Sequence, residues 1–233
     1  MAKPVCLITG VGDGTGAALA RRFAETYRVA MLARNEQRLR SLEDELAGSR
    51  AYICDVGDLK ALEAVVESVR AEMGSPNVLV HNAVSATWNT FLEADVADLE
   101  RNFRVNTMSL YYLARALAPA MIDAGSGAMV VTGNTAAHRG IASYAAFAPT
   151  KAAQRILAQS LARDLGPKGV HVAYVTIDAA IDTPWTREPF NADKPDDFFS
   201  KPADIAAEVY HVAHQPRSTW SFDVEIRPFG EKW

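Results

Sequence analysis

A glycine-rich segment at residues 9–16, TGVGDGTG, constrains the fold of this chain more than any other feature. It lies between an apolar run at residues 5–9 and a segment with helical spacing at residues 14–27. Glycine in such a turn permits positive φ, close approach of a ligand to the backbone and tight packing of the helix on the strand. The free N–H groups at the start of the helix then favour an anion. The predicted cofactor contacts in this segment are Gly10, Asp13, Gly14, Thr15 and Gly16.

Strand-like and helix-like segments alternate along the rest of the chain. Strands are expected at residues 5–9, 28–33, 51–54, 77–81, 127–132, 170–177 and 221–226. Helices are expected at residues 14–27, 36–47, 59–72, 98–124, 148–165 and 203–214. The strands are continuous apolar runs, which is typical of a parallel sheet covered by helices on both faces. The chain is therefore predicted to form one α/β domain over residues 1–233, with a Rossmann-type doubly wound sheet.

The alternation is interrupted at residues 183–201, where prolines, charges and aromatic residues are concentrated. Open α/β sheets bind ligands at the carboxyl ends of their strands, and this segment follows such an end. It is therefore predicted to be a loop that covers a substrate. Local packing or a subunit contact would explain its aromatic residues equally well.

Composition and charge exclude several classes of partner. The 233 residues carry a net charge of −4 and no run of lysine or arginine, so nucleic acid is not expected as a partner. No apolar run has the length of a membrane span, and the N-terminal residues lack the apolar segment of a signal peptide. We therefore expect a cytoplasmic protein without a membrane partner. Cys6 and Cys54 lie in strand-like runs without metal-ligand spacing, which predicts reduced core residues and no metal site.

The end of the second predicted strand indicates which dinucleotide the turn would hold. An acidic residue here commonly binds the 2′-hydroxyl of NAD, but this chain reads Leu32-Ala33-Arg34-Asn35. A guanidinium suits the 2′-phosphate of NADP instead. Arg34 therefore favours NADP(H) over NAD(H), although Asp13 and Glu36 place carboxylates close by in the sequence.

These features resemble the classical short-chain dehydrogenase/reductase family along nearly the whole chain. Residues 9–16 are similar to its TGxxxGxG turn, and residues 81–84, HNAV, resemble a degraded NNAG motif. Asn106 lies where the family has an asparagine that bends a helix, and Lys151 where it has the lysine of YxxxK. The resemblance implies an NAD(P)-dependent oxidoreductase. The cofactor contacts that it adds are Asp55 and Val56, as the adenine-contacting pair, with Asn82, Ala83, Lys151 and Thr183.

The chain departs from the family pattern where the chemistry is expected. The proton-donating tyrosine would stand four residues before Lys151, but that residue is Phe147, which has no proton to give. The serine that holds the substrate carbonyl is replaced by Asn134, whose amide can still donate a hydrogen bond. The chain is therefore identified as a member of a divergent subgroup with the pattern FxxxK. By this resemblance its catalytic residues are Asn106, Asn134, Phe147 and Lys151.

Part of the family chemistry remains possible without the tyrosine. Lys151 lies one helical turn after Phe147 and could hold the nicotinamide ribose, although a solvent-exposed helical lysine is the alternative. A positioned general acid contributes about 10²- to 10⁴-fold, so its loss weakens an enzyme without necessarily abolishing turnover. Substitute acids close in the sequence are His138, Ser143, Tyr144 and Asp178, and none of them is favoured by its position alone.

Three functions therefore remain open. The first is an NADP(H)-dependent oxidoreductase that transfers a hydride to or from a small carbonyl or alcohol substrate. The second is a module that binds NADP(H) for sensing or assembly without turnover, and the third is a protein that has lost cofactor binding altogether. The sequence does not identify the substrate.

A homo-oligomer, either a dimer or a tetramer, is also expected. In relatives the helices that correspond to residues 98–124 and 148–165 pair across subunits. Small side chains would permit such close approach, although they could equally pack inside one subunit. They are Ala145, Ala146, Ala148, Ala152 and Ala153.

Overall fold

Seven strands form one parallel sheet in the computed structural model, which describes residues 3–191 and 193–230. Residues 1–2, 192 and 231–233 of the predicted domain lie outside the described residues. Every pairing in this sheet is parallel. In order across the sheet the strands are β3 (Arg50–Ile53), β2 (Arg28–Ala33), β1 (Val5–Thr9), β4 (Val78–His81), β5 (Gly127–Asn134), β6 (Val170–Ile177) and β9 (Asp223–Ile226).

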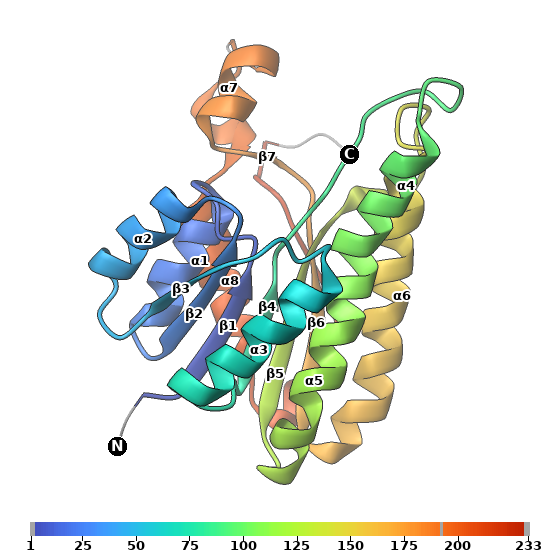
Figure 1. Cartoon of the computed structure of the whole chain (residues 1–233). Helices are drawn as coiled ribbons and strands as arrows, with labels where there is room; N and C mark the ends of the chain where they lie inside the picture. Colours follow the sequence, from blue (N-terminus) through green and yellow to red (C-terminus); the bar gives the residue numbers. More distant parts are fainter. Residues whose placement is uncertain (1–2, 192, 231–233) are drawn as a thin grey trace.

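Helices cover both faces of this sheet (Figure 1). One face carries α1 (Thr15–Ala24), α2 (Glu36–Glu45) and α8 (Pro202–Ala213). The other face carries α3 (Leu59–Met73), α5 (Ser109–Asp123) and α6 (Ala148–Leu165). The prediction of a doubly wound Rossmann-type sheet is therefore confirmed.

Two hydrophobic cores lie between the sheet and its helical layers. Successive side chains of a strand point to opposite faces, so Leu7 packs in the core beneath α5 while Cys6 and Ile8 pack in the core beneath α1. This double burial is the reason that the strands read as unbroken apolar runs. Cys6 and Cys54 are buried and free of disulfide bonds, and burial raises the pKa of the Cys54 thiol to about 11.

The predicted long helix at residues 98–124 is divided into three parts. It begins as α4 (Val96–Phe103), passes through a π-helical turn (Arg104–Met108) and continues as α5. The Ser109 N–H bonds to the Arg104 carbonyl, five residues back, which gives the wider turn of a π-helix. The single uninterrupted helix of the prediction is therefore wrong at this turn, which contains Asn106.

The segment at residues 183–201 has more structure than the loop that the sequence predicts. It contains α7 (Pro184–Phe190), a short 3-10 turn (Asp196–Phe198) and β8 (Phe199–Ser200), which pairs with β7 (Ala180–Ile181). Pro184 stands at the first helical position, where its missing N–H has no cost. The prediction of a loop is therefore wrong, because Pro184 starts a short helix here and β8 pairs with β7.

No helix within the described part of the chain has both the length and the apolar character needed to cross a membrane.

Candidate cofactor site and catalytic residues

The glycine-rich turn follows β1, the strand at which the order of strand addition across the sheet reverses. From β1 the chain builds outward to β2 and β3 on one side, and to β4, β5 and β6 on the other. Thr9 at the end of β1 pairs in register with Leu32 of β2 and His81 of β4, so the loops after these strands leave the same edge. Ligands of doubly wound sheets bind in the crevice outside such a switch point.

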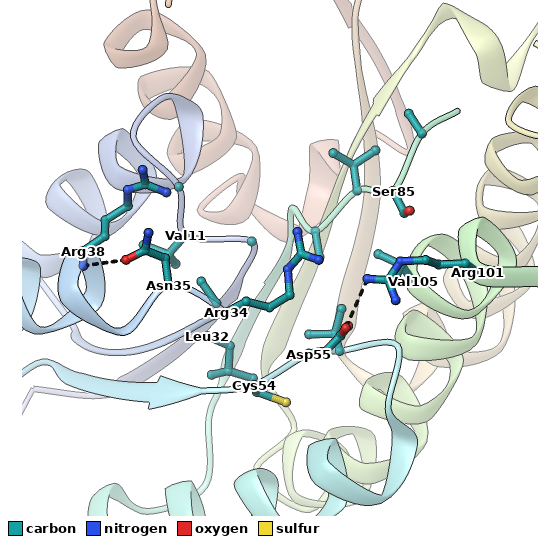
Figure 2. Close-up of a pocket in the computed structure, with 17 residues that line it drawn as sticks. Val11, Leu32, Arg34, Asn35, Arg38, Cys54, Asp55, Ser85, Arg101 and Val105 are labelled. Carbon is teal, nitrogen blue, oxygen red and sulfur yellow. Dashed lines mark hydrogen bonds and ion pairs between the residues drawn. The ribbon is translucent and has the colours of Figure 1, made fainter. Parts of the chain in front are cut away.

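A cavity of about 570 Å³ lies at this edge (Figure 2). The loops after β1, β2, β3 and β4 supply most of its wall, and α4 and the π-helical turn supply the rest. Its lining residues are Gly10, Val11, Gly12, Leu32, Ala33, Arg34, Asn35, Arg38, Cys54, Asp55, Val56, Ala83, Val84, Ser85, Ala86, Arg101 and Val105. From the sequence-predicted cofactor contacts this wall includes Gly10, Arg34, Asp55, Val56 and Ala83.

The glycine-rich turn is packed too closely to accept side chains at two positions. Gly10 has φ +70°, and a Cβ atom there would lie 2.6 Å from the Cα of Ala83. A Cβ atom on Gly16 would lie 2.3 Å from the carbonyl oxygen of Gly10. The N-cap of α1 is Gly14, which offers no side-chain oxygen to the first N–H groups of the helix. The turn therefore presents bare backbone, as a phosphate cradle requires.

Asn82 and Thr9 hold this turn in place. The Thr9 hydroxyl accepts hydrogen bonds from the backbone N–H groups of Asn82 and Ala83, each at 3.1 Å. The Asn82 amide donates to the Gly10 carbonyl at 3.0 Å and accepts from the Thr132 hydroxyl at 2.9 Å. Asn82 thus joins β4, the turn and β5, and it lies behind the cavity wall instead of lining it.

Two arginines approach the cavity from the end of β2 and the start of α2. Arg34 extends across the space between this end and the loop of Asp55 (Figure 2), and it makes no hydrogen bond or ion pair among the described residues. Arg38 forms an ion pair with Asp13, while the Asn35 side chain accepts from the Arg38 N–H at 3.0 Å and caps α2. Asp13, predicted as a cofactor contact, is therefore turned toward Arg38 and does not line the cavity.

Asp55 faces a third arginine across the cavity. Arg101 of α4 donates to the Asp55 carboxylate at 3.1 Å (Figure 2). Burial by itself would raise the pKa of Asp55, but hydrogen bonds from the Gly57 N–H and from Arg101 outweigh it and leave that pKa below its usual range. The carboxylate is therefore ionised at neutral pH and available as an acceptor.

Lys151 is buried, so the alternative of a solvent-exposed lysine is wrong. Its side chain is 2% exposed, and its Nζ donates to the Thr132 carbonyl at 3.3 Å and to the Gln154 amide oxygen. Burial lowers the pKa of Lys151 to about 7. Lys151 is not part of the cavity wall described above.

The other predicted catalytic residues lie around the start of α6. Phe147 is 2% exposed and packs with Ala136 and Ala148. The rings of Phe147 and Tyr144 pack edge to face, with their centroids 5.7 Å apart. The side-chain oxygen of Asn134 is buried and has no hydrogen-bond partner in the part of the chain that the structure describes. An acceptor in that state is suited to a donor from a bound molecule, such as a hydroxyl group.

Asn106 lies inside the π-helical turn. Its amide donates to the Ser85 carbonyl and the Thr150 hydroxyl, each at 2.8 Å, and accepts from the Ser85 N–H at 2.9 Å. The side chain of Asn106 therefore joins α6 to the loop after β4. Thr183 is also buried, and its methyl group packs on Gly14 of the glycine-rich turn.

The residues that could replace the missing tyrosine as an acid make different contacts. His138 is exposed, with its Nε2 atom 2.9 Å from the Thr176 hydroxyl, while Tyr144 makes an isolated β-bridge with Asn89. The backbone N–H of Asp178 bonds to Ile226 of β9. No hydrogen bond among the described residues connects any of these side chains to Lys151.

Four polar residues of the cavity wall were not predicted from the sequence, namely Asn35, Arg38, Ser85 and Arg101. Arg38 had a local signal, since it stands three residues after the cap Asn35 in the first turn of α2. Arg101 and Ser85 had no such signal. They reach the cavity from segments that the sequence did not place beside Asp55.

Comparisons with known proteins agree with this architecture. A family model described as short chain dehydrogenase matches residues 4–194. D-xylose 1-dehydrogenase of Caulobacter vibrioides (strain NA1000 / CB15N) is 33% identical over 174 residues, which cover 72% of this chain and 68% of that protein. The NADP-dependent 3-hydroxy acid dehydrogenase of Escherichia coli (strain K12) is 28% identical over 240 residues, 98% of this chain and 96% of that one.

Similar solved structures include a metagenomic short-chain oxidoreductase in complex with NADP. It is 29% identical to this chain with a TM-score of 0.83, and the match covers 98% of both chains. Since the family model spans most of the sequence and the fold agrees over nearly all of it, this chain belongs to the short chain dehydrogenase family.

Proposed function

We propose that this protein is an NADP(H)-dependent oxidoreductase that transfers a hydride to or from a small carbonyl or alcohol substrate, with Phe147 in place of the proton-donating tyrosine. The observation that carries the proposal is the cavity at the switch point. It has a close-packed glycine turn on one side and, on the other, Arg34, which has no ion-pair partner among the described residues. Relatives named as NADP-dependent and a neighbour solved with NADP support this cofactor.

The residues present fit such a dinucleotide. The bare backbone around Gly10 and Gly16 would hold the pyrophosphate, because a Cβ atom at either position would collide with neighbouring backbone. Arg34 and Arg38 would hold a 2′-phosphate, for which guanidinium groups provide charge and paired donors. Asp55 and Val56 line the part of the cavity that would take the adenine.

The residues around α6 would carry the chemistry. When bound, the nicotinamide ring supplies or accepts the hydride. Lys151 would bind the nicotinamide ribose, and the Asn134 amide would orient the substrate. Since Phe147 cannot donate a proton, another group must do so. Lys151 is the candidate that we favour, because burial brings its pKa to about 7 and so leaves it able to give a proton at neutral pH.

One observation favours a second function, namely binding of NADP(H) without turnover. Phe147 is closely packed with Ala136, Ala148 and Tyr144, so the position of the usual acid is a small apolar cluster. A protein with this cluster and an intact cofactor cavity could sense the cofactor or assemble with a partner.

Turnover by the wild type and by two variants separates the two functions. NADPH binding is measured by fluorescence titration, and NADPH oxidation is followed over a broad panel of small carbonyl compounds. The oxidoreductase proposal predicts substrate-dependent oxidation by the wild type, and loss of this oxidation in Lys151→Met. The proposal fails if the wild type binds NADPH but oxidises it with no substrate, while Phe147→Tyr creates the activity. Such a result supports binding without turnover.

A further inference from the structure

A cluster of polar side chains that includes Lys151 is buried between α6, the sheet and the π-helical turn. Each member is 2% exposed or less. A buried polar group is costly unless it is hydrogen-bonded, so the connections within such a cluster determine how its members are held. The members are His81, Asn106, Ser109, Thr150, Lys151 and Gln154.

Gln154 is at the centre of this cluster and uses both ends of its amide. Its Nε2 atom donates to the backbone carbonyl of Asn106 at 2.7 Å and to His81 Nδ1 at 3.2 Å. Its Oε1 atom accepts from Lys151 Nζ and, at 3.4 Å, from the Tyr174 hydroxyl. A carbonyl cannot donate and an ammonium cannot accept, so these partners allow one orientation of the amide.

This orientation determines the protonation of His81. Because Nδ1 accepts from Gln154, the neutral ring carries its proton on Nε2, which donates to the Ser109 hydroxyl at 2.7 Å. The Ser109 hydroxyl donates in turn to the Val105 carbonyl at 2.6 Å. Burial, with a smaller contribution from the charge of Lys151, lowers the pKa of His81 to about 3. His81 is therefore neutral and adds no charge to the cluster.

Lys151 is held by neutral acceptors alone. Thr132 offers a carbonyl and Gln154 an amide oxygen, and no carboxylate of the described chain bonds to the Lys151 ammonium. The titratable side chains closest in this network are His81 of β4 and Tyr174 of β6. Two of the three ammonium N–H groups are thus directed by the protein, and the position of Lys151 depends on the amide of Gln154.

We propose that Gln154 is the positioning residue for Lys151. Its neutral amide accepts from Lys151 at one end and donates to β4 and to the π-helical turn at the other. The role of Lys151 in hydride transfer rests on the proposed function, but the way in which Lys151 is held does not. Gln154 supports Lys151 from inside the protein and is not a catalytic residue.

The protonation of Lys151 tests this proposal without any need for turnover. Lysines are labelled with ¹³C at Cε, and the Lys151 signal is assigned by its absence from Lys151→Met. Gln154→Glu keeps the shape of the side chain and places a carboxylate against the ammonium, which should raise the Lys151 pKa by about 1–3 pH units. Gln154→Met removes the acceptor and should lower this pKa below its wild-type value. Gln159→Glu is the matched control on the same helix, because Gln159 is partly exposed, and it should leave the Lys151 signal unchanged.

The proposal is overturned if Lys151 titrates alike in the wild type and in folded Gln154→Glu or Gln154→Met. It is also overturned if both variants at position 154 fail to fold while Gln159→Glu folds, because Gln154 would then act as a general core residue.

Turnover gives a second measurement where the wild type is active. Small displacements of a reacting group can cost about 10²-fold in rate, so Gln154→Met should lower kcat by about that factor and change KM little. The pH profile of kcat in Gln154→Glu should move to higher pH together with the Lys151 signal. Absence of turnover in the wild type with a Lys151 signal that responds to Gln154 would contradict the proposed function alone. Turnover by the wild type, together with a Lys151 pKa that is unchanged by substitutions at Gln154, would contradict this inference alone.

Discussion

Arg34 is the residue on which the choice of cofactor depends. It extends from the end of β2 into the cavity and has no ion-pair partner among the described residues, whereas Arg38 and Arg101 are each paired with an aspartate. A cation that is already paired must share its donors with a bound phosphate. Arg34 is therefore expected to contribute more to the binding of a 2′-phosphate than either of its neighbours.

Arg34→Ala should weaken NADPH binding by about 10- to 100-fold and leave NADH binding nearly unchanged, since hydrogen bonds between charged groups contribute about 1.5–3 kcal/mol. Fluorescence titration with both cofactors measures the change. Arg50→Ala is the control, because Arg50 is exposed on β3 and does not line the cavity. Equal weakening of NADPH and NADH would contradict a specific contact with the 2′-phosphate.

Lys151 should make the stability of the protein depend on pH. Its pKa is about 7 in the folded state against the ordinary 10.5, so between these values the unfolded chain binds the extra proton. The contribution of Lys151 to the free energy of unfolding should therefore rise with pH from about 7 to about 10.5, with a slope of up to about 1.4 kcal/mol per pH unit.

Lys151→Met should remove this rise, which urea unfolding at several pH values would measure. Lys168→Met serves as the control, because Lys168 is a surface residue that pairs with Asp164. The interpretation fails if the wild type and Lys151→Met show the same dependence on pH between 7 and 10.

At the scale of elements, α7 is attached to the domain by a few polar contacts. Arg187 donates to Asp182 at 2.5 and 3.0 Å and to Asp196 at 2.9 Å, and its guanidinium lies 4.3 Å from the centre of the Phe199 ring. The hydrogen bond from Arg187 is the main reason that the pKa of Asp182 lies below its usual value. These contacts connect α7 to β7 and β8, so Arg187 keeps residues 180–200 together.

Arg187→Met should loosen this segment while the rest of the protein changes little. Partly exposed ion pairs contribute about 0–1 kcal/mol to global stability, so the unfolding midpoint should move only slightly. Hydrogen exchange should nevertheless become faster at residues 180–200. Arg40→Met, which removes surface ion pairs of α2, should leave exchange in this segment as it is. Unchanged exchange at residues 180–200 in Arg187→Met would show that other contacts order α7.

At the scale of the whole molecule, one outer surface carries exposed apolar residues. Phe103 of α4, Tyr111 of α5 and Ile156 of α6 are 38%, 48% and 56% exposed, and α5 and α6 lie side by side (Figure 1). We propose that this surface pairs with a second copy of the chain. Ala146 and Ala148 are buried within the monomer, so these two residues do not form the small-residue contact that the sequence suggested.

Ile156→Glu should shift an oligomer toward monomer, because it places a charge on the apolar surface. Light scattering after size-exclusion chromatography measures the molar mass at several concentrations. Ser41→Glu adds the same charge on α2 and should not change the mass. An Ile156→Glu variant with the molar mass of a wild-type oligomer would place the subunit contact elsewhere, and a monomeric wild type would exclude the pairing itself.

The features that depend on neighbouring residues could be predicted from the amino-acid sequence alone. The apolar runs, the glycines of residues 9–16 and the helical spacing after them predicted a doubly wound sheet with a cofactor cavity at its edge. Gly10 and Arg34 were found because each stands directly after a predicted strand, and Asp55 was found through the resemblance to the short-chain dehydrogenase/reductase family. Even the two main errors were local in kind, since a π-helical turn and a short helix that starts at a proline change the pattern by only a few residues.

Which side chains meet could not be predicted in this way, because it depends on how the whole chain folds. Folding brings residues that are far apart in the sequence within hydrogen-bond distance, as with Asp55 and Arg101 or His81 and Gln154. The spacing of apolar residues along the chain does not indicate such contacts. The burial of Lys151 is decided in the same way, because it depends on the layers that close around α6 and not on the residues beside it. Protonation follows from burial and partners, so the chemical state of the candidate site could be derived only after the chain was folded.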